Sequence, residues 1–366
     1  MSEDLRLATI REGVTELLVP EDHASNGPSS SDMPVFYNPK MEFSRDMSVV
    51  VLGSLLKDGD SFLDGLAASG ARGIRVKKES GVDIQLHLND GNPLAVDLAG
   101  RNLSLNGITG AVTTRQDLRT LLLTTRHNCI DVDPFGTPAP FISMAVGAVR
   151  NNGILCATAT DTGTISGIFS AACKRRYSCE ARRAPFYHEI GVRNLLGFIA
   201  REAAKQDVGI HPIVAYYADH YVRAFMRLER GAGRADDSLA NLGYCSFDKS
   251  TLERGFQEDC ERGVMGPIWI APTCDVQSLS EIKIRPHLKF ADKIAGLLSQ
   301  LKEEAAIGKP HFTMDELSRM SGTDNPKMEF LLERLRANGE KATRTHFGPK
   351  TFRTDASVKE IIAAMR

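Results

Sequence analysis

The chain has 366 residues, a length that accommodates roughly two or three domains, and its 42% apolar content allows sizeable cores. Lys and Arg (45) nearly balance Asp and Glu (46), so a polyanionic ligand would have to bind at local basic patches. No apolar stretch is long enough to span a membrane, and the N-terminus lacks a signal peptide's apolar core. The seven scattered cysteines fit reduced thiols of a cytoplasmic protein better than a disulfide framework.

Aromatic side chains precede the first predicted helix. Phe36 and Tyr37 come directly before a helix expected over residues 42–56, and an edge strand is expected within residues 12–20. The aromatic pair can be interpreted as a hydrophobic staple at the start of the helix. It can also be interpreted as the wall of a binding site, to which Arg45 adds a positive charge.

A loop of small residues follows the next predicted strand. The strand runs to Asp64, and Gly, Ala and Ser then dominate up to Gly70, where a helix begins. Small residues let backbone amides and a helix N-terminus approach a nucleotide-type cofactor, although this loop is not a G-x-G-x-x-G. A second strand, residues 84–90, ends in Asp90, where an acid can bind ribose hydroxyls. An ordinary Asp-Gly turn is the alternative interpretation of Asp90.

Strands and helices continue to alternate along the chain. A helix is predicted over residues 93–105, a strand near 111–115 and a further strand over 153–161. Asp117, just after the strand near 111–115, could contact the adenine amino group of a cofactor. This alternation predicts an α/β domain with a mostly parallel, doubly wound sheet.

The strand that ends at Val132 is followed by Asp133, Pro134 and Phe135. Pro134 lacks an amide hydrogen and favours an extended Asp133, so the strand stops abruptly at its carboxyl end. Ligands of open α/β sheets bind at that edge. Asp133 could accept a hydrogen bond from an exocyclic amino group while Phe135 stacks on the base. A plain strand-to-loop turn explains the same residues equally well.

Basic side chains gather after the strand over residues 153–161. Residues 173–183 contain five basic side chains against one acid. Contact with RNA phosphates is the favoured interpretation, and a solvated helix face is the alternative. The basic residues are Lys174, Arg175, Arg176, Arg182 and Arg183.

The pattern changes after a helix at 189–206, which is expected to close a first domain of residues 1–207. Residues 212–228 are predicted to form a long, bent or bulged strand. The tail at 309–366 is predicted as helix, turn, helix, hairpin and a last helix, which is the order of a winged-helix-like module. Residues 208–366 are therefore expected to form a C-terminal α+β domain.

Taken in order, these motifs resemble the tRNA (guanine-26 N2)-dimethyltransferase family, which uses S-adenosylmethionine. The matching segments cover most of residues 10–270. They include residues 36–42, 63–75, 89–90, 133–141, 157–162, 173–177 and 220–223.

The resemblance implies a class I methyltransferase domain that acts on tRNA, and it implies roles for single residues. Asp133 would be catalytic, and Phe36 and Phe135 would sandwich the target guanine. The residues that would hold the cofactor are Arg45, Arg72, Asp90, Asp117 and Leu118.

The cysteine pattern departs from that of the family, many members of which carry four cysteines as a zinc site in the C-terminal domain. Here the region offers Cys245 and Cys260, with Cys274 further on, and no paired C-x-x-C. A structural zinc needs four ligands, so we predict that the chain holds no metal.

The predicted chemistry depends on Asp133. Guanine N2 is a poor nucleophile because its lone pair is delocalised into the ring, and a hydrogen bond to Asp133 would raise its electron density.

Two alternatives to this function remain: methylation of another base, such as adenine N6 or a different RNA guanine, and a non-catalytic RNA-binding relative. The presence of Asp133, Arg45 and Asp90 argues against the second alternative. The sequence leaves open which tRNAs are substrates, whether one or two methyl groups are added, and the oligomeric state.

Overall fold

A computed structural model describes residues 6–23 and 33–366 of the chain. The described residues form two compact units. Unit 1 comprises the described part of Met1–Ala157 together with Ser280–Gly296, and unit 2 comprises Thr158–Leu279 together with Leu297–Arg366. Across the described ranges, no helix combines the length and the apolar character that crossing a membrane requires.

Unit 1 begins with an antiparallel hairpin of β1 (Leu7–Glu12) and β2 (Thr15–Pro20). The edge strand expected within residues 12–20 is therefore the second strand of this hairpin. Two short 3-10 helices follow in the described residues, Glu21–His23 and Pro39–Met41, before α1 (Glu42–Leu55). The Asn38 side chain caps the second of them by accepting from the Lys40 amide at 2.9 Å, which fixes the chain directly after the aromatic pair.

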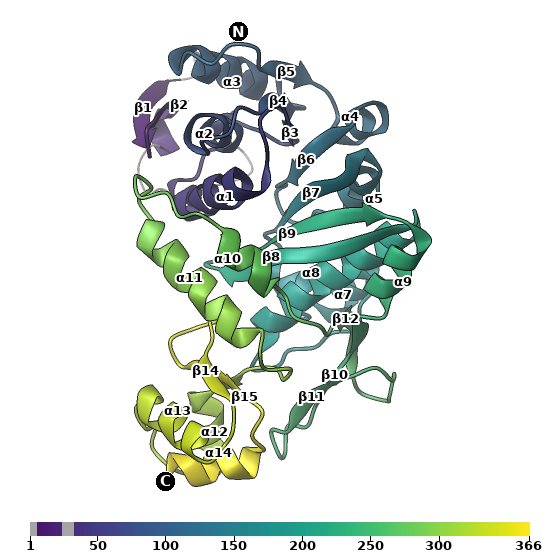
Figure 1. Cartoon of the computed structure of the whole chain (residues 1–366), viewed down its shortest axis with the longest axis vertical. Helices are drawn as coiled ribbons and strands as arrows, with labels where there is room; N and C mark the ends of the chain where they lie inside the picture. Colours follow the sequence, from purple (N-terminus) through teal and green to yellow (C-terminus); the bar gives the residue numbers. More distant parts are fainter. Residues whose placement is uncertain (1–5, 24–32) are drawn as a thin grey trace. The chain divides into compact units, whose positions relative to one another are not determined.

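Parallel strands alternate with helices through the rest of unit 1, as the sequence predicts. Their order in the sheet is β5-β4-β3-β6-β7, and each neighbouring pair is parallel. Figure 1 shows α1, α2 and α3 on one side of these strands and α4 and α5 on the other. This doubly wound arrangement confirms the predicted fold class. The elements are β3 (Ser61–Asp64), α2 (Ala71–Glu79), β4 (Gln85–Asp90), α3 (Pro93–Leu105), β5 (Val112–Arg115), α4 (Leu118–Thr124), β6 (His127–Val132), α5 (Ala139–Ala148) and β7 (Val149–Ala159).

A network of buried charges joins the hairpin to the helices of unit 1. The guanidinium of Arg75 on α2 is fully buried and pairs with Glu12 at 3.1 Å, Asp46 at 2.6 Å and Glu79 at 2.8 Å. Burial alone would raise the pKa of Glu12, but Arg45 and Arg75 together lower it to about 2. Removing one member of such a network would leave an uncompensated buried charge.

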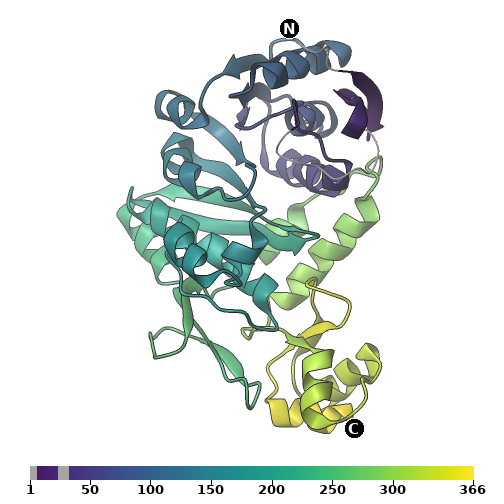
Figure 2. The ribbon, with the colours of Figure 1, turned by 180° about the vertical axis from the view of Figure 1, so that it is seen from behind.

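Unit 2 continues with helices and antiparallel strands, seen from behind in Figure 2. The sequence pattern predicted a long, bent or bulged strand over residues 212–228, and the prediction of a single strand is wrong, although the register of β8 shifts between Pro212 and Val214. The chain turns at Asp219, whose φ is +47°, and β8 pairs antiparallel with β9. The elements up to the tail, of which the last two helices belong only in part to unit 2, are α6 (Thr162–Ile165), α7 (Ser170–Tyr177), α8 (Tyr187–Ala204), β8 (Val208–Ala218), β9 (Tyr221–Arg230), α9 (Ala232–Leu239), β10 (Leu242–Phe247), β11 (Arg254–Gln257), β12 (Met265–Trp269), α10 (Val276–Glu281) and α11 (Ala291–Glu304).

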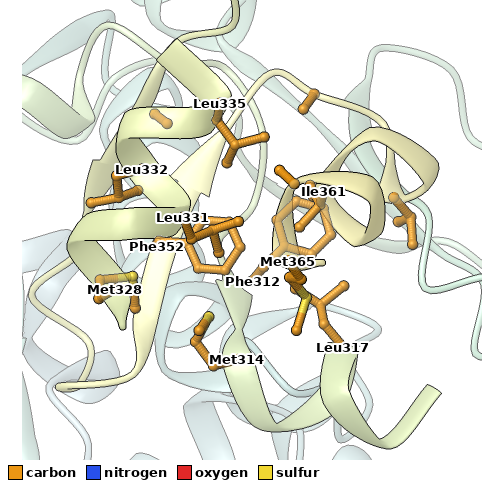
Figure 3. Close-up of a cluster of buried hydrophobic side chains, with 14 of the residues drawn as sticks. Phe312, Met314, Leu317, Met328, Leu331, Leu332, Leu335, Phe352, Ile361 and Met365 are labelled. Atoms are coloured by element: carbon orange, nitrogen blue, oxygen red, sulfur yellow. The ribbon is translucent and has the colours of Figure 1, made fainter. Parts of the chain in front are cut away.

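The tail of the chain has its own apolar core, shown in Figure 3. Phe312, Leu331, Phe352 and Ile361 are each at most 1% exposed there. Capping boxes at Thr313 and Ser357 begin its first and last helices. The order of elements agrees with the prediction, and the comparison with a winged helix stays a prediction. The elements are β13 (Phe312–Thr313), α12 (Met314–Ser321), α13 (Met328–Ala337), β14 (Ala342–Arg344), β15 (Thr351–Thr354) and α14 (Val358–Met365).

Glu189 on α8 binds the tail by a buried ion-pair cluster within unit 2. Its carboxylate lies 2.8 Å from Arg193, 2.8 Å from Arg353 and 2.8 Å from Nδ1 of His311. Burial alone would raise the pKa of Glu189, but the charges of Arg353 and Arg193 and the hydrogen bond from His311 hold it well below its ordinary value. The tail is thus joined to α8 by charge pairs that water does not reach.

Candidate active site

Acidic side chains collect at the carboxyl edge of the parallel strands of unit 1. β3 ends at Asp64, which is in register with Asp131 of β6, and β4 ends at Asp90. Asp133 follows the last residue of β6. The register of the sheet therefore brings together acids that lie far apart in the sequence, at the edge where ligands of such sheets bind.

The guanidinium of Arg72 joins two of these acids. Its Nη2 donates a short hydrogen bond to Oδ2 of Asp133, and its Nε lies 3.4 Å from Oδ2 of Asp131. Its Nη1 donates to Ser48 Oγ at 2.7 Å and to the backbone oxygen of Ser44 at 3.2 Å. Arg72 is buried, whereas the side chain of Asp133 remains 18% exposed. Arg72 therefore fixes the carboxylate of Asp133 from the interior of the protein, while part of the carboxylate remains accessible to a ligand.

Asp64 and Asp131 are buried acids to which sequence analysis assigned no role. Oδ2 of Asp64 accepts from the Gly73 amide at 3.0 Å. Burial, together with the charges of Asp131 and Asp133, raises the pKa of Asp64 to about 7, against the opposing charge of Arg72. The available signal was the presence of acids inside apolar strand sequences, because a charged residue is rarely buried without a partner.

Phe36 and Phe135 are brought together, as the sequence suggested, but in a closed geometry. Their ring centroids are 4.6 Å apart and the ring planes meet at 85°. A base stacked between two parallel rings needs more space than this edge-to-face contact leaves. Phe135 is 59% exposed, so its ring can turn away without disturbing a packed core. The expected sandwich stays a prediction that requires this movement.

Arg45 lies in the buried network behind the aromatic pair. Its Nε donates to Glu12 at 2.8 Å, and its Nη2 also donates to the backbone oxygen of Asn38 at 3.1 Å. Its guanidinium carbon lies 5.0 Å from the centre of the Tyr37 ring. These hydrogen bonds hold Arg45 through Nε and Nη2. They leave Nη1 unused.

The loop after β3 has the shape of a cradle for a nucleotide-type ligand. A Cβ atom added at Gly65 would lie 2.9 Å from the Leu118 side chain and 3.0 Å from the backbone oxygen of Asp131, so a larger residue would force these neighbours to shift. Asp90 fixes the same loop, because Oδ2 accepts from the Ala68 amide at 2.9 Å. These small residues and the carboxylate of Asp90 fit an adenosyl cofactor.

Asp117 and Leu118 begin α4 at the same edge. Oδ1 of Asp117 caps the helix by accepting from the Arg119 amide at 2.9 Å, and hydrogen bonds from Arg119 lower the pKa of this exposed acid to about 2. Leu118 is buried against the cradle. The backbone amides and Leu118 therefore have fixed positions from which to contact a cofactor.

The basic residues singled out in the sequence lie on and after α7 in unit 2, and all are exposed. Lys174 pairs with Glu180 at 2.5 Å, and Arg176 pairs with Asp161 at 3.1 Å. Arg175 and Arg183 have no carboxylate partner in the part of the chain that the structure describes. Among the described residues, the hydrogen bond of Arg182 is a long one, 3.5 Å from Nη2 to the backbone oxygen of Phe247.

The cysteines in the region where a zinc site was considered lie in different surroundings. Cys245 is buried on β10, Cys260 is exposed, and Cys274 is buried with its Sγ 3.3 Å from the backbone oxygen of Leu301. Within residues 6–23 and 33–366, no three His, Cys, Asp or Glu side chains are grouped so that they could hold a metal ion. The expected absence of zinc stays a prediction.

A doubly wound sheet with an acid-rich carboxyl edge and a small-residue cradle defines a Rossmann-like protein of the class I methyltransferase type. The family model described as N2,N2-dimethylguanosine tRNA methyltransferase matches residues 13–366. The chain belongs to this family.

Individual relatives agree over the whole length. The tRNA (guanine(26)-N(2))-dimethyltransferases of Metallosphaera sedula and Thermococcus kodakarensis are each 36% identical to this chain. Both alignments cover 99% of this chain, and they cover 97% and 100% of the two relatives. The solved structure of Trm1 from Pyrococcus horikoshii with S-adenosyl-L-methionine matches with a TM-score of 0.89 and 33% identity, covering 98% of this chain and 100% of that one.

Proposed function

We propose that this chain transfers methyl groups from S-adenosylmethionine to the exocyclic N2 of guanine 26 in tRNA, and that it does so in the cytoplasm. The observation that carries the proposal is the carboxylate of Asp133, fixed by Arg72 at the end of β6 and flanked in sequence by the exposed ring of Phe135. An acceptor beside an aromatic ring is what a base with an exocyclic amine requires. We assign the catalytic domain to residues 1–207 and a second domain to residues 208–366.

The cofactor site in this proposal consists of the cradle after β3 and the acids beside it. Asp90 accepts from the ribose hydroxyls, and Asp117 with Leu118 contacts the adenine. Arg45 offers Nη1 to the amino-acid portion, and Arg72 acts from behind Asp133. When bound, S-adenosylmethionine supplies the methyl group as an electrophile.

Asp133 acts on the nucleophile. Its accessible oxygen accepts a hydrogen bond from the N2 amino group, which orients the nitrogen lone pair and raises the electron density on the nitrogen. Orientation contributes a large part of such rate enhancement. Acceptance of the proton by a positioned side chain adds about 10²–10⁴-fold. The hydrogen bonds of Arg72 to Ser48 and Ser44 keep that oxygen in one place during both methyl transfers.

Base binding requires the aromatic pair to open. Taking a base out of its stack costs a few kcal/mol. Stacking on Phe36 and Phe135 contributes roughly 1–3 kcal/mol per base and offsets this cost. The exposed basic side chains on and after α7 contact phosphates of the tRNA. These contacts supply the part of the affinity that does not depend on sequence.

The test is mass spectrometry of nucleosides from a tRNA transcript incubated with the protein and isotope-labelled S-adenosylmethionine. We expect labelled N2-methylguanosine or N2,N2-dimethylguanosine from a transcript with guanine at position 26, and none from a matched transcript with adenine there. Label found on adenine or on a different guanine would contradict guanine 26 as the target and would identify the base that is methylated instead. The Asp133→Ala variant should bind the cofactor and transfer less than about a tenth of the wild-type label, and a higher level would exclude Asp133 as the activating group.

A further inference from the structure

The loop between α6 and α7 displays an aromatic side chain to solvent. Phe169 is 63% exposed and its neighbour Ile168 is 40% exposed. No aromatic ring contacts Phe169 within residues 6–23 and 33–366. Adjacent exposed apolar side chains can mark a contact site on a protein surface.

The local backbone fixes the position of this ring. The Phe169 amide donates to the backbone oxygen of Gly163 at 3.1 Å, which closes the loop. A Cβ atom at Gly163 would lie 2.8 Å from Cε2 and 3.1 Å from Cδ2 of the ring, so the edge of the ring rests on a bare α-carbon. The start of the loop is fixed as well, because Asp161 accepts from the Tyr177 hydroxyl at 2.6 Å. The ring is therefore preorganised while most of its surface remains exposed.

Positive charge follows the ring directly. Phe169 is the N-cap residue of α7, and Arg175 lies about 9 Å further along the helix axis. Arg175 and Arg183 are exposed and have no carboxylate partner among the described residues, so their charges are available to a ligand. An exposed ring beside such cations is the combination that binds single-stranded nucleic acid.

We propose that Phe169 is a stacking platform for an unpaired base of the tRNA, and that Arg175 contacts a phosphate of the same segment. This site is additional to the aromatic pair of the active site, because it lies on a different loop and stacks a base that is not methylated. The proposal rests on the proposed function only in taking tRNA as the ligand.

The experiment measures binding of full-length tRNA to the whole protein by filter retention, over a series of salt concentrations. Phe169→Ala and Phe169→Leu should each weaken binding by about 5- to 150-fold, whereas Phe169→Tyr should bind within about twofold of wild type. Leu and Tyr both fill the space above Gly163, so their difference reports stacking and not packing. Leu123→Ala removes a side chain that is 68% exposed on α4 and serves as the matched control, with unchanged affinity expected.

The salt dependence of tRNA binding distinguishes the contribution of the Phe169 ring from that of the Arg175 charge. The Phe169 variants should leave the slope of log affinity against log salt unchanged, whereas Arg175→Ala should flatten it by roughly one. A direct signal is also available, because the single tryptophan, Trp269, is buried. In Phe169→Trp the added indole is the exposed fluorophore, and tRNA should quench it while an excess of free cofactor does not.

Three results would overturn the proposal: wild-type affinity in Phe169→Ala, equal affinity of the Leu and Tyr variants, or loss of self-association in Phe169→Ala without a change in tRNA binding. The last result would assign the ring to contact with a second copy of the chain. Failure of the proposed function is distinguishable from all three, because it would appear as absent methylation of guanine 26 by the wild-type protein.

Discussion

Asp131 lies 3.4 Å from Nε of Arg72, on the same edge of the guanidinium as Nη2, which donates to Asp133. Asp131 is fully buried, so it does not contact substrate. We interpret Asp131 as a positioning residue of Arg72. The Nε–Nη2 edge contacts Asp131 and Asp133 while Nη1 donates to Ser48, and a guanidinium held in this way cannot rotate.

The first prediction is that Asp131→Asn lowers kcat for methyl transfer by about 10- to 100-fold while KM for the cofactor changes little, because a small displacement of a reacting group is costly. Asp131→Glu should recover part of the rate, which a purely structural defect would not. Steady-state kinetics check this prediction. Asp83→Asn is the control, because Asp83 is an exposed acid that forms an ion pair with Lys77. An equal loss in kcat and in cofactor affinity would show that Asp131 acts on the cofactor site.

The second prediction concerns the aromatic pair. Phe135→Leu should lose methyl transfer by about 5- to 150-fold because the stacking surface is gone, whereas Phe135→Tyr should keep most of it. Both variants should melt close to wild type, since the side chain is 59% exposed. Single-turnover assays at saturating cofactor measure the effect, and equal rates for the two variants would exclude stacking on this ring.

The third prediction is that Asp90→Ala weakens S-adenosylmethionine binding by about 1.5–3 kcal/mol, since a ribose hydroxyl loses a charged acceptor. Asp90 also accepts from the Ala68 and Asn92 amides, so Asp90→Asn is the milder companion variant. Calorimetric titration checks the affinities. Unchanged affinity in both variants would remove Asp90 from the site.

The fourth prediction uses the raised pKa of Asp64, about 7 in the folded chain against about 3.9 in an unfolded one. Between these values the folded state binds more protons, so this group makes stability fall as pH rises from about 4 to 7. Asp64→Asn keeps an acceptor for the Gly73 amide and removes the titration.

Thermal unfolding of wild type and Asp64→Asn should therefore give similar melting temperatures near pH 5. The variant should become the more stable one by pH 8. A difference that is constant across this range would show that Asp64 does not titrate there.

The fifth prediction is that purified protein contains well under one zinc ion per chain. Cys245 and Cys274 are buried, and in the described residues no further ligands gather around either. Elemental analysis after dialysis checks this, and a stoichiometric zinc that survives dialysis would contradict it.

Much of the fold could be predicted because its signals are local. The strand that ends at Val132 is an apolar run closed by Pro134, and α3 begins at a capping Asn92 followed by proline. The turn between β8 and β9 was missed because no glycine or proline marks it. Asp219 adopts the left-handed conformation there, which aspartate tolerates better than most residues.

The site was predicted less completely because its contacts are long-range. Asp133 was proposed as a site residue from its own neighbours in sequence. Its partner Arg72 is 61 residues away and was assigned to the cofactor, and nothing local links Glu12 to Arg45 across 33 residues. Such pairs follow from strand register and helix placement, which a single sequence does not specify.

The cluster at Glu189 changes how deletions of this chain would have to be interpreted. Cutting the chain before His311 would remove two of the three cationic or donor groups that neutralise this carboxylate: Arg353 and His311 would be lost, and Arg193 alone would remain. Glu189 would then keep a charge in apolar surroundings, or α8 would have to loosen to hydrate it. A truncated protein that failed to bind tRNA would therefore report damage to α8, and it could not be used to map RNA contacts to the tail. Point substitutions on the exposed faces of α13 avoid this confusion.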